Sequence, residues 1–179
     1  FTEEQPFSVL LAQMQSGKTG AYLYTSFEMV RRGIVERVVI ICGSSDTSLR
    51  DQTKMELEGA YDAFLMETMR NQDLDGAMKL QTARKKFGVF FSHDLKSIDD
   101  IGTKTLIIHD ESHMAQSKNN TPYKAFYQKN KLADALMGDF TLLNEKGNFI
   151  LGVSATPFSE IVANKKVRSD DWTAEEKSF

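Results

Sequence analysis

Residues 8–19 read SVLLAQMQSGKT. The run 8–11 is short and apolar and leads into a polar loop that closes on Gly17, a pattern typical of a buried strand followed by a turn. Residues 18–32 have a helical pattern with apolar side chains along one side, and Gly33 is expected to end that helix. A strand, a loop and a helix in this order predict an α/β unit whose loop lies at the carboxyl end of the strand.

Four more apolar runs follow, and helical segments separate them. The expected further strands are 35–42, 87–91, 105–109 and 148–153, and the expected further helices are 47–70 and 123–136. These strands lack polar alternation, which favours a parallel sheet buried on both faces. We therefore expect an α/β fold, with a parallel sheet that carries helices on both faces and functional residues just after its strands.

The composition is that of one globular domain. The chain has 179 residues, of which 41% are hydrophobic, with a net charge of −3. No apolar run approaches the ~20 residues that span a bilayer, so no membrane partner is expected. Cys42 is the single cysteine, which excludes an internal disulfide and favours an intracellular, reducing compartment, cytoplasmic or nuclear. The chain begins at Phe1 without a Met, and we expect it to be an excised fragment.

Residues 12–19 fit the phosphate-binding pattern G-x-x-x-x-G-K-[ST], with Ala12 in the first glycine position. In such a loop backbone N–H groups surround the phosphates, and the next helix points its positive end at them. A lysine adds charge at the β- and γ-phosphates, and a hydroxyl binds Mg²⁺. The alternative is a chance match in a strand-to-helix turn. The expected nucleotide-binding residues are Ala12, Gln13, Met14, Gln15, Ser16, Gly17, Lys18 and Thr19.

An acidic pair, Asp110 and Glu111, follows the strand at 105–109. A carboxylate at the end of a buried strand can hold Mg²⁺, and its neighbour can polarise an attacking water. The pair could instead belong to a solvated acidic loop. A zinc site formed by His109 and His113 is disfavoured, because ligands four residues apart need a helix to share one face.

Three motifs together carry a resemblance to a known family. AQMQSGKT at 12–19, DESH at 110–113 and SATP at 154–157 resemble, in order and spacing, motifs I, II and III of superfamily-two helicases and translocases of the DExH type. The resemblance covers residues 11–158. It implies the first lobe of a RecA-like P-loop NTPase, similar to restriction-type or phage-defence ATPase domains and some viral helicases.

The resemblance implies roles for individual residues. Lys18 and Thr19 would take the phosphates and Mg²⁺, Asp110 would hold Mg²⁺, and Glu111 would be the base that activates water. The residues implied to couple nucleotide state to nucleic-acid contacts are His113, Ser154 and Thr156, and weaker candidates for nucleic-acid contacts are Ser44, Arg50 and Ser92. The weaker candidates lie in stretches that also read as plain strand-to-helix turns with capping side chains.

The implied function is a nucleic-acid-dependent ATPase that uses ATP and Mg²⁺ and acts on DNA rather than RNA. We expect residues 1–163 to form the lobe and 164–179 a polar tail or linker, with too few residues after the third motif for a second RecA-like lobe. The isolated chain should therefore bind Mg-ATP weakly and hydrolyse it poorly. Two alternatives remain open: a P-loop ATPase that remodels proteins, and a non-catalytic RecA-like scaffold.

Overall fold

The computed structural model describes residues 5–11, 17–42, 47–91, 94–98, 100–110 and 123–154, with the backbone alone at 47–50 and 123. Its centre is a five-stranded sheet in the order β1-β5-β4-β2-β3. Every neighbouring pair of strands is parallel, as the sequence predicts. The strands are β1 (Phe7–Leu11), β2 (Arg37–Cys42), β3 (Phe87–Phe91), β4 (Thr105–Asp110) and β5 (Phe149–Ser154).

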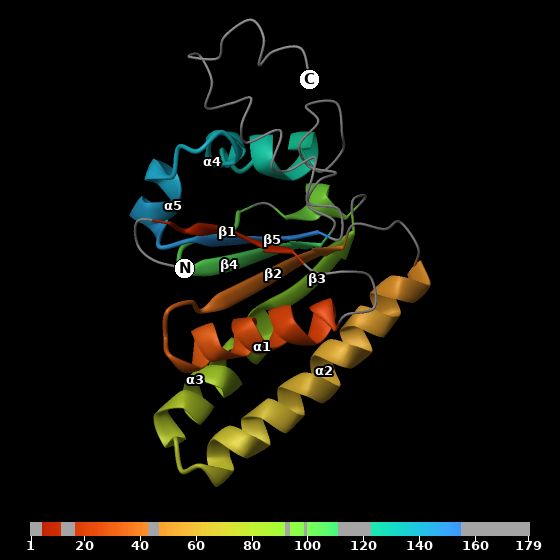
Figure 1. Cartoon of the computed structure of the whole chain (residues 1–179), viewed down its shortest axis with the longest axis vertical. Helices are drawn as coiled ribbons and strands as arrows, with labels where there is room; N and C mark the ends of the chain where they lie inside the picture. The colour runs from red at the N-terminus through yellow and green to blue at the C-terminus, as the bar shows by residue number, and fades with distance from the viewer. Residues whose placement is uncertain are drawn as a thin grey trace, which may run out of the picture.

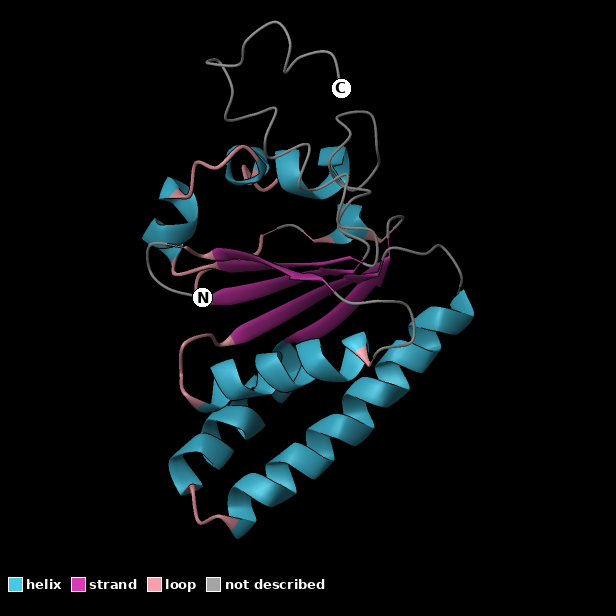
Figure 2. Ribbon diagram, viewed as in Figure 1, coloured by secondary structure: helices cyan, strands magenta, loops and turns pink. Residues whose placement is uncertain are grey.

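Helices cover both faces of this sheet, which confirms the predicted layering. Figure 1 shows α1, α2 and α3 on one face and α4 and α5 on the other, and Figure 2 shows the strands between these two layers. The helices are α1 (Lys18–Arg31), α2 (Thr47–Arg70), α3 (Leu74–Ala83), α4 (Ala133–Leu136) and α5 (Thr141–Lys146), with short turns η1 (Arg84–Lys86) and η2 (Leu95–Ser97) and the π-helix η4 (Tyr123–Gln128). None of the helices described is long and apolar enough to cross a bilayer.

The continuous apolar runs in the strands supply two separate cores. In β2, Val38 and Ile40 enter the core beneath α1 to α3, whereas Val39 and Ile41 enter the core on the other face. Successive strand residues point to opposite faces, so both faces are buried only where every position is apolar. A sheet with a core on each face needs apolar residues at successive strand positions. This explains why these strands lack the alternation of polar and apolar residues, the feature that predicted a parallel sheet.

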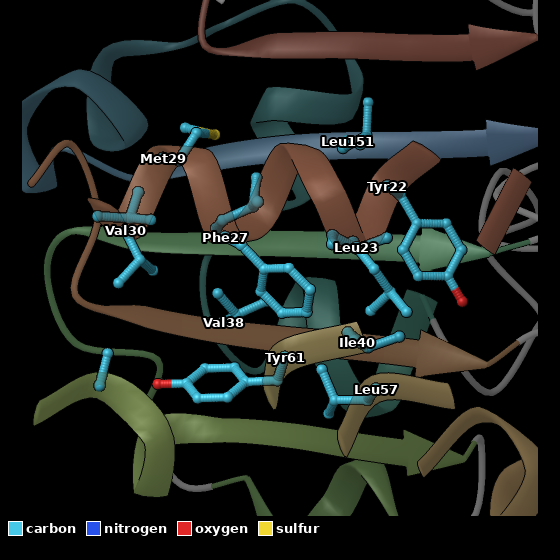
Figure 3. Close-up of a cluster of buried hydrophobic side chains, with 14 of the residues drawn as sticks. Tyr22, Leu23, Phe27, Met29, Val30, Val38, Ile40, Leu57, Tyr61 and Leu151 are labelled. Carbon is cyan, nitrogen blue, oxygen red and sulfur yellow. The ribbon is translucent and has the colours of Figure 1, made fainter. Parts of the chain in front are cut away.

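Helix α1 follows β1 and lies against the sheet with Leu23, Phe27 and Val30 fully buried (Figure 3). It ends where Gly33 adopts a φ of +73°, a left-handed conformation that glycine adopts without steric cost. The Gly33 N–H donates to the Val30 carbonyl at 2.9 Å and completes the last turn. The chain then reverses into β2, so that the helix runs back along the strands that it covers.

The segment 123–136 differs from the single helix that the sequence predicts. It consists of η4 and α4, separated by a turn in which Lys131 has a φ of +59° and the Leu132 N–H donates to the Tyr127 carbonyl at 2.7 Å. The wider turn of η4 places both Phe126 and Tyr127 in the second core. Helices α3 and α5 were not predicted, and the second strand begins at Arg37 rather than at residue 35.

Candidate functional site

The predicted functional segments meet at the carboxyl edge of the sheet. Since the strands are parallel, the ends of β1, β5 and β4 lie side by side, with Leu11 opposite Ser154 and Val153 opposite Asp110. Helix α1 begins just after β1 at the same edge. The strand order places β5 between the strand that precedes the phosphate-binding loop and the strand that ends in the acidic residue.

Lys18 and Asp110 face each other across this edge. The Lys18 Nζ lies 3.7 Å from a carboxylate oxygen of Asp110, and their side chains are 14% and 29% exposed. Lys18 opens α1 and Asp110 ends β4, so the pair spans the width of the strand between them. The structure thus brings together the cation predicted to bind phosphate and the carboxylate predicted to hold the metal.

Gly17 precedes α1 in a left-handed conformation, with a φ of +80°. Among the residues that the structure describes, none has an atom within 4 Å of a Cβ placed at this position. The carbonyl of Gly17 accepts the first helical hydrogen bond, from Ala21 N–H at 3.1 Å. The N–H groups at the start of α1 therefore point towards the edge where Lys18 lies, as an anion-binding helix terminus requires.

Tyr22 belongs to this site, although the sequence assigned it only to the apolar side of the helix. It lies one turn after Thr19 on α1 and is 1% exposed. Burial, and then the nearby Asp110 carboxylate, raise the pKa of the Tyr22 phenol far above its usual range, so the phenol keeps its proton. Tyrosine occurs both in cores and at polar sites, so the sequence alone did not show that its phenol lies near Asp110.

His109, next to Asp110 on β4, points into the opposite core. It is fully buried, and its Nδ1 is 2.9 Å from the hydroxyl of Tyr127 in η4. The two rings also stack at a centroid distance of 5.6 Å. Among the residues described, no cluster of three His, Cys, Asp or Glu side chains could hold a metal. His109 therefore has a structural partner in the core.

The residues present fit Mg²⁺ bound with a nucleotide. Mg²⁺ prefers oxygen ligands and in nucleotide sites takes one or two from the protein, with waters and phosphate oxygens completing its shell. The hydroxyl of Thr19 and the carboxylate of Asp110 are oxygen ligands of this kind, and Lys18 supplies a positive charge for the phosphates. A third ligand from the protein is not required.

Several predicted site residues lie outside the described residues, and the structure does not place them. They are Ala12, Gln13, Met14, Gln15, Ser16, Ser44, Ser92, Glu111, His113 and Thr156, together with the side chain of Arg50, whose backbone belongs to α2. Of the remaining residues, Gly17, Lys18, Thr19, Asp110 and Ser154 all lie at the carboxyl edge. Ser154 is fully buried at the end of β5.

One family model matches most of the chain. The model described as type III restriction enzyme, res subunit, matches residues 4–159. The members of this family are helicase-like, ATP-hydrolysing domains with a RecA-type P-loop fold. The parallel sheet of this chain, with helices on both faces, is consistent with that fold. No match is found among curated proteins.

Proposed function

Because this chain belongs to the family of type III restriction enzyme res subunits, we propose that it is the ATP-binding lobe of a DNA-dependent motor of the helicase or translocase type. The observation that carries the proposal is the approach of Lys18 to within 3.7 Å of Asp110, beside Gly17 at the start of α1. A lysine for phosphate and a carboxylate for Mg²⁺ at one sheet edge are what phosphoryl transfer from ATP needs.

In the proposed reaction, water attacks the γ-phosphate of ATP in line with the bond to the leaving oxygen. Lys18 and the N–H groups at the start of α1 would hold the phosphates, and Thr19 and Asp110 would hold the metal. Glu111 orients the water and accepts its proton. When bound, Mg²⁺ would supply positive charge to the phosphates, and the residues of the chain would position the reacting groups.

Coupling to nucleic acid is proposed to pass through the edge of the same sheet. Ser154 ends β5, which pairs with both β1 and β4, so it lies beside the two strands that lead into the proposed nucleotide site. We assign Ser154, Thr156 and His113 to this coupling. Ser44, Arg50 and Ser92, which follow β2 and β3 in the chain, are assigned to contacts with the phosphodiester backbone, which position a strand without reading its sequence.

A second RecA-like lobe of the same protein is proposed to complete the site. We place the first lobe at residues 1–163, of the DExH type, and the start of a connection at 164–179. The second lobe would supply an arginine to the γ-phosphate, a contribution worth about 10³–10⁵ in rate in related chemistry. On this proposal the isolated chain binds Mg-ATP and turns it over slowly.

The test is ATP turnover by the full-length protein, measured without polymer and with single-stranded DNA, duplex DNA and RNA in turn. We expect DNA to stimulate turnover and Glu111→Gln to abolish it while ATP binding remains. Glu145→Gln, a change at an exposed position of α5, is the matched control and should leave turnover unchanged. Turnover that no polymer stimulates would contradict the motor and favour a protein-remodelling ATPase, and absence of turnover would favour a scaffold.

A further inference from the structure

We propose that the amino edge of the sheet carries a groove that binds a single strand of DNA. The groove lies at the starts of β2, β3 and β4, at the end of the strands opposite to the ATP site (Figure 1). Its phosphate contacts would be Lys85, Lys86 and Lys104, and a base would lie against Phe90. The inference goes beyond the proposed function, because none of these residues belongs to the ATP site or to the contacts assigned to the carboxyl edge.

Two adjoining hollows form this amino-edge groove. One has a volume of about 340 Å³ and the other of about 580 Å³, and Glu36 and Lys86 line both of them. The cationic side chains that line the two hollows are Arg32, Arg37, Lys79, Lys85, Lys86 and Lys104. Glu36 is the one acidic residue among the described residues that line them. Because the whole chain has a net charge of −3, this excess of positive charge is a local feature of the amino edge.

Three of the six cations already lie beside an acidic residue. These pairs are Arg32 with Glu28, Lys79 with Asp75, and Arg37 with Asp100. The first two are ion pairs at 2.6 Å, and in the third the guanidinium donates to the main-chain carbonyl at 2.7 Å. The cations that remain for a ligand are therefore the three lysines at and beside the junction of the two hollows.

Glu36 occupies the place of an anion between two of these lysines. Its carboxylate lies 3.2 Å from the Lys104 Nζ and 3.7 Å from the Lys86 Nζ. All three side chains are about half exposed, so water screens these pairs and they contribute little to stability. One carboxylate cannot balance both lysines, and Lys85 forms no ion pair with any residue that the structure describes. The remaining positive charge fits a ligand with several negative charges, such as a chain of phosphates.

The larger hollow also has an aromatic side. Phe90 is half-buried, packs against the second core and lines this hollow. A Cβ at Gly88 would collide with the Phe90 ring, so the ring lies over the backbone of Gly88, two residues earlier on the same face of β3. Bases of a single strand stack on aromatic side chains whatever their sequence, whereas the bases of a duplex are already stacked on one another. An aromatic ring beside cations therefore favours a single strand.

The experiment measures how a thymidine oligonucleotide protects lysines of the full-length protein from acetylation, in the absence of nucleotide. We expect protection of Lys85, Lys86 and Lys104. The oligonucleotide concentration that half-protects Lys85 gives the affinity at this groove alone, apart from any binding at the carboxyl edge.

Removal of the internal anion should strengthen binding. We expect Glu36→Gln to lower the half-protecting concentration by about two- to fivefold, the worth of an exposed ion pair, because Lys86 and Lys104 become available to phosphate. Glu67→Gln is the matched control. It changes the net charge equally, at an acid that pairs with Arg70 at 2.9 Å near the end of α2, and should leave protection unchanged.

The aromatic contact is tested with Phe90→Leu, which keeps an apolar side chain against the core. We expect the half-protecting concentration to rise by about fivefold or more with the thymidine oligonucleotide, the effect of losing one stacked base, and to stay the same with an abasic oligonucleotide. Phe140→Leu alters another half-buried ring of the same core and should change neither value.

Three results would overturn the inference. The first is a lack of protection at the three lysines, which would leave the proposed function standing, since the stimulation of ATP turnover by DNA is measured separately. The second is an equal change in Glu36→Gln and Glu67→Gln, because net charge alone would then explain the binding. The third is an equal loss with both oligonucleotides in Phe90→Leu, because no base would then stack on the ring.

Discussion

Replacement of Asp110 by asparagine should make ATP bind more tightly in the absence of Mg²⁺. In the protein without ligand, the Asp110 carboxylate holds the Lys18 ammonium at 3.7 Å. A phosphate that arrives without a metal must compete for that ammonium and must also approach the negative charge of Asp110. Asparagine keeps the shape of the side chain and removes the charge, so both penalties should disappear.

The size of the effect can be worked from the Lys18–Asp110 distance. Two unit charges 3.7 Å apart attract by about 4.5 kcal/mol at an effective dielectric constant of ~20. The Lys18 and Asp110 side chains are 14% and 29% exposed, so water screens part of this attraction. Exposed pairs contribute about 1 kcal/mol or less, and we take about 1–2 kcal/mol for this partly buried pair. In EDTA, Asp110→Asn should therefore bind ATP with an affinity about 5- to 30-fold higher than that of the unsubstituted chain.

The assay is equilibrium ATP binding to Asp110→Asn and to the unsubstituted chain, in EDTA and in Mg²⁺, with thermal unfolding as the check that the variant is folded. In Mg²⁺ the variant should lose the enhancement that the metal provides. Asp75→Asn is the control, because Asp75 pairs with Lys79 at 2.6 Å on the exposed side of α3. An affinity in EDTA that is no higher in Asp110→Asn, or an enhancement by Mg²⁺ that survives, would refute the reasoning.

Three further predictions concern stability. Hydrogen bonds from Arg31, chief among the causes, lower the pKa of Glu28 from 4.5 to about 2. The folded pKa lies below the unfolded one, so Glu28 stabilises the fold above the unfolded pKa and this contribution is lost as the pH falls from about 4.5 towards 2. The urea concentration at the unfolding midpoint should fall as the pH is lowered from about 6 to about 3, and it should fall less in Glu28→Gln. An equal dependence on pH in the two proteins would contradict this. Phe27→Ala removes a ring that is 1% exposed and packed against three aromatic neighbours, at a cost of about 3–5 kcal/mol in the free energy of unfolding. A urea titration that gives less than about 1 kcal/mol would show that this core is not packed as described. Tyr127→Phe removes the hydroxyl bonded to His109 and should cost about 1–2 kcal/mol in the same titration, where no loss would refute the contact.

The strands and the sheet type were predictable because a strand that is buried on both faces has an uninterrupted run of apolar residues. Residues 38–42 of β2 include no polar side chain, and a parallel sheet between two helical layers is the arrangement that buries all of them. The placement of Lys18 and Asp110 at one edge then followed from parallel strands alone. The strand order, with β5 between β1 and β4, did not follow from the sequence, because pairing depends on long-range packing.

Other features were hidden because their cause lies in tertiary contacts. The break after η4 depends on a positive φ at Lys131, a residue type that rarely adopts that conformation. The sequence does contain a capping residue for helix α3, because the Asp73 side chain accepts a hydrogen bond from the Gly76 N–H at 2.9 Å. Helix α3 was still missed, because only a short turn separates it from α2.

The most direct test of the central claim, that Lys18 and Asp110 mark an ATP site, is the equilibrium affinity for ATP in Mg²⁺ of the unsubstituted chain and of Lys18→Ala. Lys79→Ala, which removes a lysine from a surface ion pair on α3, is the matched control. We predict saturable binding that falls by about 10- to 100-fold in Lys18→Ala, the worth of a hydrogen bond to a charged group, and that is unchanged in Lys79→Ala. Equal affinity in all three proteins would contradict the claim.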